Sequence, residues 1–189
     1  MNPRALVGLL LMIIGAVGGI LYQRWQAQQA ASAAPPAVAS QHQAPAEQPA
    51  GTERRIDFTL PDVEGRTRSL HEWDGKVIVL NFWATWCPPC VREIPALQTL
   101  YETYRERGLV VVGVAIDTTQ PVIDFIDPQG VEYPILIADR DGPALTQRYG
   151  NRLTVLPYTV VIDRQGRIVY RHRSEITFDQ AKAVIEPLL

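Results

Sequence analysis

The sequence has little cysteine and almost no net charge. Cys87 and Cys90 are the only cysteines among 189 residues, so a disulfide-rich scaffold is excluded, and any disulfide within the chain joins these two. The formal net charge is −2, whereas a nucleic-acid-binding domain normally carries a basic excess. We therefore expect no nucleic-acid partner. Hydrophobic residues make up 47% and charged residues 20%, which excludes a wholly disordered chain.

Charge is also missing from a long stretch near the N-terminus. Residues 5–22 are an uninterrupted uncharged run between Arg4 and Arg24. Eighteen residues of helix measure roughly 27 Å, close to the thickness of a bilayer's hydrocarbon core. The sequence therefore predicts an N-terminal transmembrane helix, with residues 1–25 as a membrane anchor that contacts the lipid bilayer through its apolar run. A cleaved signal peptide is the alternative, with its first small-x-small site at residues 31–33.

The next segment, residues 26–51, lacks aromatic residues and contains one acidic residue. It consists mainly of alanine, glutamine and proline, which cannot bury enough apolar surface to offset the entropy lost on ordering. We expect a flexible linker here. From residue 52 the pattern changes to regular apolar runs, and residues 52–189 are expected to form one globular domain.

Strands and helices alternate in the predicted globular part. The apolar runs 77–84 and 109–116 indicate strands covered on both faces. Helical spacing of apolar residues over 88–107 predicts the crossover helix of a βαβ unit. Around this α/β unit we expect an opening hairpin at 56–60 and 66–70, helices at 121–130, 142–150 and 178–189, and strands at 133–138, 158–163 and 167–172.

The two cysteines lie where a buried strand leads into this helix. Cys87 is placed at the helix N-terminus, where unpaired amides and the helix dipole favour a thiolate. Cys90 lies about one turn along on the same side, so it can attack a mixed disulfide formed by Cys87. Trp86 offers an apolar docking surface beside them. The pattern predicts thiol–disulfide exchange in which Cys87 attacks and Cys90 resolves.

Three other uses of the cysteine pair remain open. A zinc or copper site needs further ligands, which His71 and His172 could supply. A purely structural disulfide would close a loop too short to stabilise the fold much. A peroxidatic cysteine fits poorly, because Thr85 lies two rather than three residues before Cys87. Exchange fits best and requires no metal or cofactor, and a copper-handling module that uses the thiols as ligands is the alternative function.

Three segments together resemble the membrane-anchored TlpA/ResA/CcmG (DsbE) branch of the thioredoxin-like proteins: 80–95 (LNFWATWCPPCVREIP), 113–117 (GVAID) and 156–172 (LPYTVVIDRQGRIVYRH). The resemblance implies a thioredoxin fold with an αβ insertion near residues 118–140. It also implies a catalytic domain in the periplasm, attached to the bacterial inner membrane, that reduces protein disulfides. Expected partners are disulfide-containing proteins such as apocytochrome c, and a membrane thiol donor of the CcdA/DsbD kind.

The resemblance carries over to three single positions. Pro157 matches the family's cis-proline, which implies that the backbone of Leu156 pairs with a substrate strand. Asn81 stands where cytoplasmic thioredoxins have a buried aspartate, and its amide cannot ionise. Glu93 matches an acidic residue of the ResA-like branch, which implies a role in moving the proton of the cysteine pair. A solvated carboxylate at the start of the helix is the alternative for Glu93.

The sequence supports less specific expectations for three single residues and one short segment. Trp83 is expected to pack in the core and Asp117 to form a turn at a strand end. Arg92 is expected to be solvated, and residues 171–173 to form an exposed strand end.

Overall fold

The computed structural model describes Trp25 and residues 53–189. The predicted anchor (1–25) and linker (26–51) lie outside the described residues, apart from Trp25. Within the described part of the chain, no helix is both long enough and apolar enough to cross a membrane.

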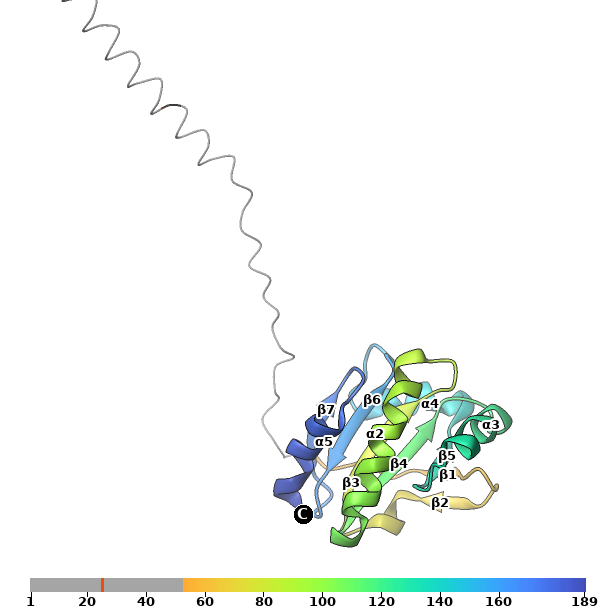
Figure 1. Ribbon diagram of the computed structural model, residues 1–189, viewed down its shortest axis with the longest axis horizontal. Coiled ribbons are helices and arrows are strands. Elements are labelled where there is room, and N and C mark those ends of the chain that lie inside the picture. Colours follow the sequence, from red (N-terminus) through yellow and green to blue (C-terminus); the bar gives the residue numbers. More distant parts are fainter. Residues whose placement is uncertain (1–24, 26–52) are drawn as a thin grey trace, which may run out of the picture. The chain divides into compact units, whose positions relative to one another are not determined.

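A five-stranded mixed sheet forms the centre of the domain (Figure 1). Its strand order is β5-β4-β3-β6-β7, in which β3, β4 and β5 run parallel while β6 and β7 are antiparallel to their neighbours. A separate two-stranded sheet pairs β1 with β2 and confirms the predicted opening hairpin. The strands are β1 (Thr59–Pro61), β2 (Thr67–Ser69), β3 (Val77–Trp83), β4 (Leu109–Ala115), β5 (Ile135–Ile137), β6 (Tyr158–Ile162) and β7 (Ile168–His172).

Both faces of the sheet are covered, which explains why β3 and β4 are buried at every position. Successive side chains of a strand point to opposite faces. In β3, Val77 and Val79 accordingly pack in a cluster with residues of the helices α2 (Pro88–Tyr104), α3 (Thr119–Gln129) and α5 (Phe178–Ile185). Ile78 and Leu80 pack in a second cluster with Leu145 of α4 (Gly142–Arg148) and with the short 3₁₀ helix η1 (Leu70–Trp73). The two clusters are the two halves of the core.

The helices follow the predicted order, but several end earlier than predicted. They are α2 (Pro88–Tyr104), α3 (Thr119–Gln129), α4 (Gly142–Arg148) and α5 (Phe178–Ile185). The predicted helices over 88–107 and 178–189 finish as 3₁₀ turns, η2 (Arg105–Arg107) and η4 (Glu186–Leu188). Another 3₁₀ turn, η3 (Asp139–Asp141), precedes α4. Such tightening of a last turn is common, and apolar spacing alone does not distinguish it from α-helix.

The topology brings two loops to one end of the sheet. β3 ends at Trp83 and α2 begins at Pro88, so the loop between them carries Cys87. In the antiparallel register Phe82 lies opposite Tyr158, the first residue of β6. The loop that leads into β6 therefore borders the same end of the sheet as the cysteine loop. The segment predicted as an αβ insertion, 118–140, contains α3 and β5.

Candidate redox site

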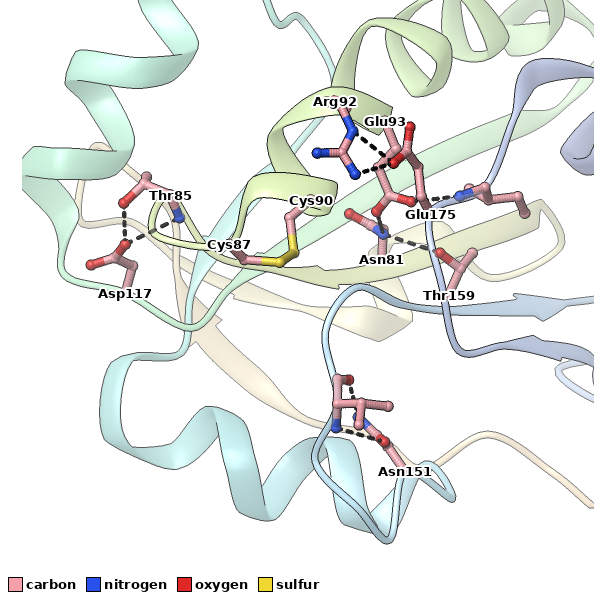
Figure 2. The surroundings of a disulfide bond; sticks show 12 residues. Asn81, Thr85, Cys87, Cys90, Arg92, Glu93, Asp117, Asn151, Thr159 and Glu175 are labelled. Atoms are coloured by element: carbon pink, nitrogen blue, oxygen red, sulfur yellow. Dashed lines mark hydrogen bonds and ion pairs between the residues drawn. A yellow bond between two sulfur atoms is a disulfide. The ribbon is translucent and has the colours of Figure 1, made fainter.

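Cys87 and Cys90 form a disulfide at the start of α2 (Figure 2). Cys87 is the N-cap residue: its backbone is extended, and its carbonyl accepts the N–H of Val91 at 3.2 Å. Pro88 and Pro89 fill the next two positions, where their missing N–H groups cost nothing. Cys87 is 5% exposed and Cys90 is fully buried. Cys87 is thus the more exposed of the two cysteines, as predicted, although both are largely covered.

The proline pair limits which backbone donor a reduced Cys87 can use. An N-cap side chain accepts from the N–H of the second or third helical residue. Here the second is Pro89, which has no N–H, so the N–H of Cys90 is the available donor. In the reduced protein, this donor and the helix dipole would both stabilise a thiolate at Cys87.

Glu93 lies one turn beyond Cys90 and is buried, with 1% of its surface exposed. Its Oε1 accepts a hydrogen bond from Nδ2 of Asn81 at 2.7 Å, and its Oε2 accepts one from the N–H of Ile176 at 2.9 Å. Asn81 also donates to Oγ1 of Thr159 at 3.0 Å. The alternative that Glu93 is a solvated helix-start carboxylate is therefore wrong.

Burial raises the pKa of Glu93 to about 7. The hydrogen bonds from Ile176 and Asn81 oppose this shift because they stabilise the charged form, and the nearby negative charge of Glu175 adds to it. A carboxyl group with such a pKa gains and loses a proton near neutral pH. Perturbed groups of this kind are concentrated at functional sites.

Arg92 and Glu175 form an ion pair beside Glu93, with Nη2 and Oε2 2.7 Å apart and a second bond from Nε at 2.9 Å (Figure 2). Glu175 directly precedes Ile176, so the pair ties α2 to the segment whose N–H binds Glu93. Arg92 is 58% exposed, as the sequence predicted, and in addition it is held in this ion pair. The roles of Glu175, Ile176 and Thr159 carry no sequence signal, because these residues meet Glu93 or Asn81 only through the fold.

Asp117 anchors the cysteine loop from the other side (Figure 2). Its Oδ2 accepts from both the N–H and the hydroxyl of Thr85, and its Oδ1 accepts from the N–H of Thr118 at 2.8 Å. Asp117 is thus the predicted turn residue at the end of β4, and in addition it fixes the loop that carries Trp86 and Cys87.

The residues predicted to meet a substrate lie around the disulfide. Trp86 is 65% exposed, whereas Trp83 is fully buried and packs against Phe125, with ring centroids 5.5 Å apart. Leu156 is half-buried and packs against the core cluster that contains both cysteines. The Leu156–Pro157 peptide bond is cis, as predicted.

The histidines considered as metal ligands have other contacts. His71 pairs with Asp57 and Asp74, and His172 contacts Tyr170 and Ser174. Arg171, next to His172, is paired with Glu53 rather than freely exposed, which corrects the expectation for 171–173. Among the described residues, no group of three or more histidine, cysteine, aspartate or glutamate side chains could hold a metal ion.

The sequence matches the Redoxin family over residues 46–185. The chain belongs to this family. Among curated relatives, this Redoxin-family chain is 36% identical to the thiol-disulfide oxidoreductase ResA of Halalkalibacterium halodurans over 71% of the chain and 74% of the relative. It is 31% identical to ResA of Geobacillus thermodenitrificans over 95% of the chain and 92% of the relative.

Solved structures give the same result for the fold. A thioredoxin-family thiol:disulfide interchange protein from Chlorobium tepidum is 27% identical with a TM-score of 0.66, over 72% of this chain and 95% of that one. A putative thioredoxin from Neisseria meningitidis is 28% identical with a TM-score of 0.63, over 72% and 90%. The fold is thioredoxin-like, and the protein is a thiol–disulfide oxidoreductase of the ResA/DsbE type.

Proposed function

We propose that this oxidoreductase is held by an N-terminal membrane anchor and acts in the periplasm as a reductant of protein disulfides, including those of apocytochrome c. The observation that carries the reductant role is the buried Glu93 one turn from the buried Cys90. A resolving thiol without solvent contact needs a base within the protein, and a carboxylate with a pKa near 7 can serve as one.

The reaction takes two exchange steps. The Cys87 thiolate attacks a substrate disulfide, forming a bond between Cys87 Sγ and one substrate sulfur, while the other substrate sulfur leaves as a thiolate and takes up a proton. Cys90 then loses its proton towards Glu93 and attacks Cys87 Sγ. This step forms the Cys87–Cys90 disulfide and releases the second substrate sulfur, which takes up a proton. Two electrons pass from the cysteine pair to the substrate, which leaves as two thiols.

The oxidised pair must be reduced again after each turnover. We propose a membrane dithiol donor of the CcdA/DsbD kind, which would transfer two electrons to the pair by the same two steps in reverse. The location is supported by the uncharged run at residues 5–22 and by the need for a compartment in which substrate disulfides form. Mass analysis of the membrane-extracted protein would test the anchor, because a mature N-terminus near Ala34 would contradict it.

A trapping experiment tests the reductant role. The Cys90→Ala variant, expressed as the full chain in a bacterial host, should accumulate mixed disulfides through Cys87, which mass spectrometry after thiol blocking can identify. The Cys87→Ser variant is the matched control and should trap no partner. Trapped periplasmic proteins with cysteine pairs, apocytochrome c among them, would support the proposal. Equal yields of partners from the two variants would contradict it.

A further inference from the structure

A cleft of about 250 Å³ lies at the end of the sheet opposite the disulfide. Its walls come from three parts of the chain: the start of the described domain (54–57), the segment that leads into β3 (71–76) and the turn between β6 and β7 (163–166). β3 begins directly after the second of these parts, and its seven residues extend roughly 20 Å to the cysteine loop. The cleft is therefore separate from the redox site, and no step of disulfide exchange uses it.

Arg55 brings a buried positive charge to the wall of this cleft. Its side chain is 8% exposed, and its Nη2 forms ion pairs with Oδ1 of Asp57 at 3.1 Å and with Asp74. His71 bridges the same two carboxylates. Nη1 of Arg55 is also buried, but it has no hydrogen-bond partner in the described part of the chain. Buried donors are normally paired, because an unpaired one is costly. The unpaired N–H groups of Arg55 therefore favour an acceptor bound in the cleft.

Two exposed cations beside Arg55 lack a carboxylate partner. Arg54 and Lys76 line the cleft, and neither forms an ion pair with any residue that the structure describes. Arg54 Nη2 and Arg55 Nε lie 3.7 and 3.6 Å from the position that a Cβ atom on Gly166 would occupy, so both guanidinium groups pack beside the same turn. Like charges held this close repel each other, and a bound anion would remove that repulsion.

The carboxylates of the cleft do not offset these cations, because each already has a partner. Asp57 and Asp74 are both paired with Arg55. Asp163 is 3% exposed and is paired with Arg167, with Oδ2 and Nε 2.6 Å apart. The charged groups that are still open to a ligand are therefore positive.

The size and the remaining walls of the cleft indicate which kind of anion fits. Sites that enclose a whole drug-sized molecule measure roughly 300–1,000 Å³, so a cleft of about 250 Å³ holds a smaller group. Trp73 and Ile78, both buried, supply an apolar wall. Three cationic side chains reach the cleft from two segments. They suit the charge and the several oxygens of a phosphate group better than the two coplanar oxygens of a carboxylate.

We propose that this cleft, here called the Arg55 cleft, binds a phosphate group that carries a small organic substituent. Arg54 and Lys76 donate charge-assisted hydrogen bonds to the phosphate oxygens, and Nη1 of Arg55 supplies a further donor. The substituent contacts Trp73. A soluble phosphate monoester and the headgroup of an anionic phospholipid share this chemistry. The site is additional to the proposed reductant function and does not depend on it.

Calorimetric titration of the full chain in a neutral detergent tests the proposal. The ligands are inorganic phosphate, glycerol 3-phosphate as a soluble monoester, and glycerophosphoglycerol, which is the deacylated form of phosphatidylglycerol. All titrations use the same ionic strength, because salt screens the charges. We expect an organic phosphate to bind saturably, at one site per chain, and more tightly than inorganic phosphate. Tighter binding of the diester would identify a lipid headgroup as the ligand, and tighter binding of the monoester a soluble phosphate ester.

The double variant Arg54→Gln/Lys76→Gln should weaken this binding about tenfold or more, because each substitution removes one charged donor. Both side chains are exposed, so the substitutions keep the fold, and the test does not require a change at the buried Arg55. Arg140→Gln/Arg148→Gln is the matched control, because it removes two exposed positive charges that do not line the cleft. The control should bind as the wild type does. All three reduced proteins should react with 2-hydroxyethyl disulfide at the same rate, which verifies that they are folded.

Three results would overturn the proposal. The first is that none of the three ligands binds saturably to the wild type. The second is that the Arg54→Gln/Lys76→Gln variant binds as tightly as the wild type. The third is an equal loss of affinity in the control, which would assign the binding to the net charge of the protein and not to the Arg55 cleft. Each of these results leaves the reductant function intact, because that function is tested separately by the cysteine variants.

Discussion

Asn81 Nδ2 donates to Glu93 Oε1 across 2.7 Å in a fully enclosed part of the core. The pair joins a strand residue that cannot ionise to a helix residue that can. Cytoplasmic thioredoxins, which this chain resembles, have a buried aspartate at the strand position. Here the ionisable group next to the cysteine pair belongs to α2, and the strand supplies a hydrogen-bond donor that stabilises its charged form.

Replacing Glu93 by glutamine should change how stability depends on pH. Glu93 is buried with a pKa of about 7, so between about pH 4.5 and pH 7 the unfolded chain releases a proton that the folded chain retains. The stabilisation from this group is complete below pH 4.5 and is lost as the pH rises through 7. The free energy of unfolding of the wild type should therefore fall by about 3 kcal/mol relative to Glu93→Gln over this range.

Urea unfolding of the oxidised protein at a series of pH values measures this difference. Glutamine also leaves one of the two donors, Asn81 Nδ2 or the Ile176 N–H, without an acceptor, which adds a constant cost at every pH. The prediction is therefore that the difference in unfolding free energy between the two proteins changes with pH, whatever its value at any single pH. Glu106→Gln is the control, because this side chain is 91% exposed and the same charge is removed at the surface. Wild-type and Glu93→Gln stabilities that run parallel from pH 4.5 to 7 would refute the prediction.

The ion pair between Arg92 and Glu175 should tune Glu93 without contributing much to stability. The negative charge of Glu175 raises the pKa of Glu93, so Glu175→Gln should lower that pKa and Arg92→Gln, which leaves Glu175 uncompensated, should raise it. We expect the pH–rate profile of disulfide reduction to shift by about half a unit, to lower pH in the first variant and to higher pH in the second.

Opposite shifts distinguish this tuning from a structural role. If the pair only held Ile176 in place, both variants would slow the reaction and move the profile in the same direction. The pair is half exposed, so the loss of unfolding free energy should stay below about 1 kcal/mol in each variant.

Local sequence was enough to predict the cysteine loop and its setting. The buried strand, the prolines at the helix start and the two thiols are contiguous, and a thiol at a helix N-terminus has a known chemistry. The surroundings of Glu93 could not be predicted in the same way. Its partners Asn81 and Ile176 lie 12 and 83 residues away, and its burial depends on how α2 packs against the segment before α5.

The shape of the loop that leads into β6 could not be predicted for a different reason. Residues 151–157 have no helical or strand periodicity, so their apolar side chains gave no indication of direction. The hydrogen bonds of Asn151 to Val155 decide that Leu153 points into solvent. Only the register between Phe82 and Tyr158 places this loop at the same end of the sheet as the disulfide.

Asp117→Asn should loosen the cysteine loop. The substitution replaces one of the two carboxylate oxygens by an NH₂ group. If this group faces Thr85, it meets two donors where the oxygen accepted from both. If the amide is reversed, the bond from the Thr118 N–H is lost instead. We expect a loss of about 1–2 kcal/mol in unfolding free energy and slower reduction of protein disulfides. Thr85→Val removes the hydroxyl bond but keeps the N–H bond, so its effect should be about half as large. Equal stability of Asp117→Asn and the wild type would show that Asp117 does not anchor the loop.

Replacing Glu93 by glutamine should also change the pKa of Cys87. When Glu93 is ionised, its negative charge opposes formation of the Cys87 thiolate and partly cancels the effect of the helix N-terminus. Glu93→Gln should therefore lower the pKa of Cys87 while slowing turnover, because Cys90 loses the base that accepts its proton. The rate of alkylation of the reduced protein as a function of pH gives the pKa of Cys87, and insulin reduction gives the turnover. Glu106→Gln is the matched control: it removes the same charge from a side chain that is 91% exposed and keeps the carboxyl group of Glu93 near Cys90. Unchanged alkylation and turnover in Glu93→Gln would show that the carboxyl group only fills the core. A lower Cys87 pKa together with slower turnover, both absent from the control, would show that the Glu93 carboxyl group takes part in moving the proton of the cysteine pair.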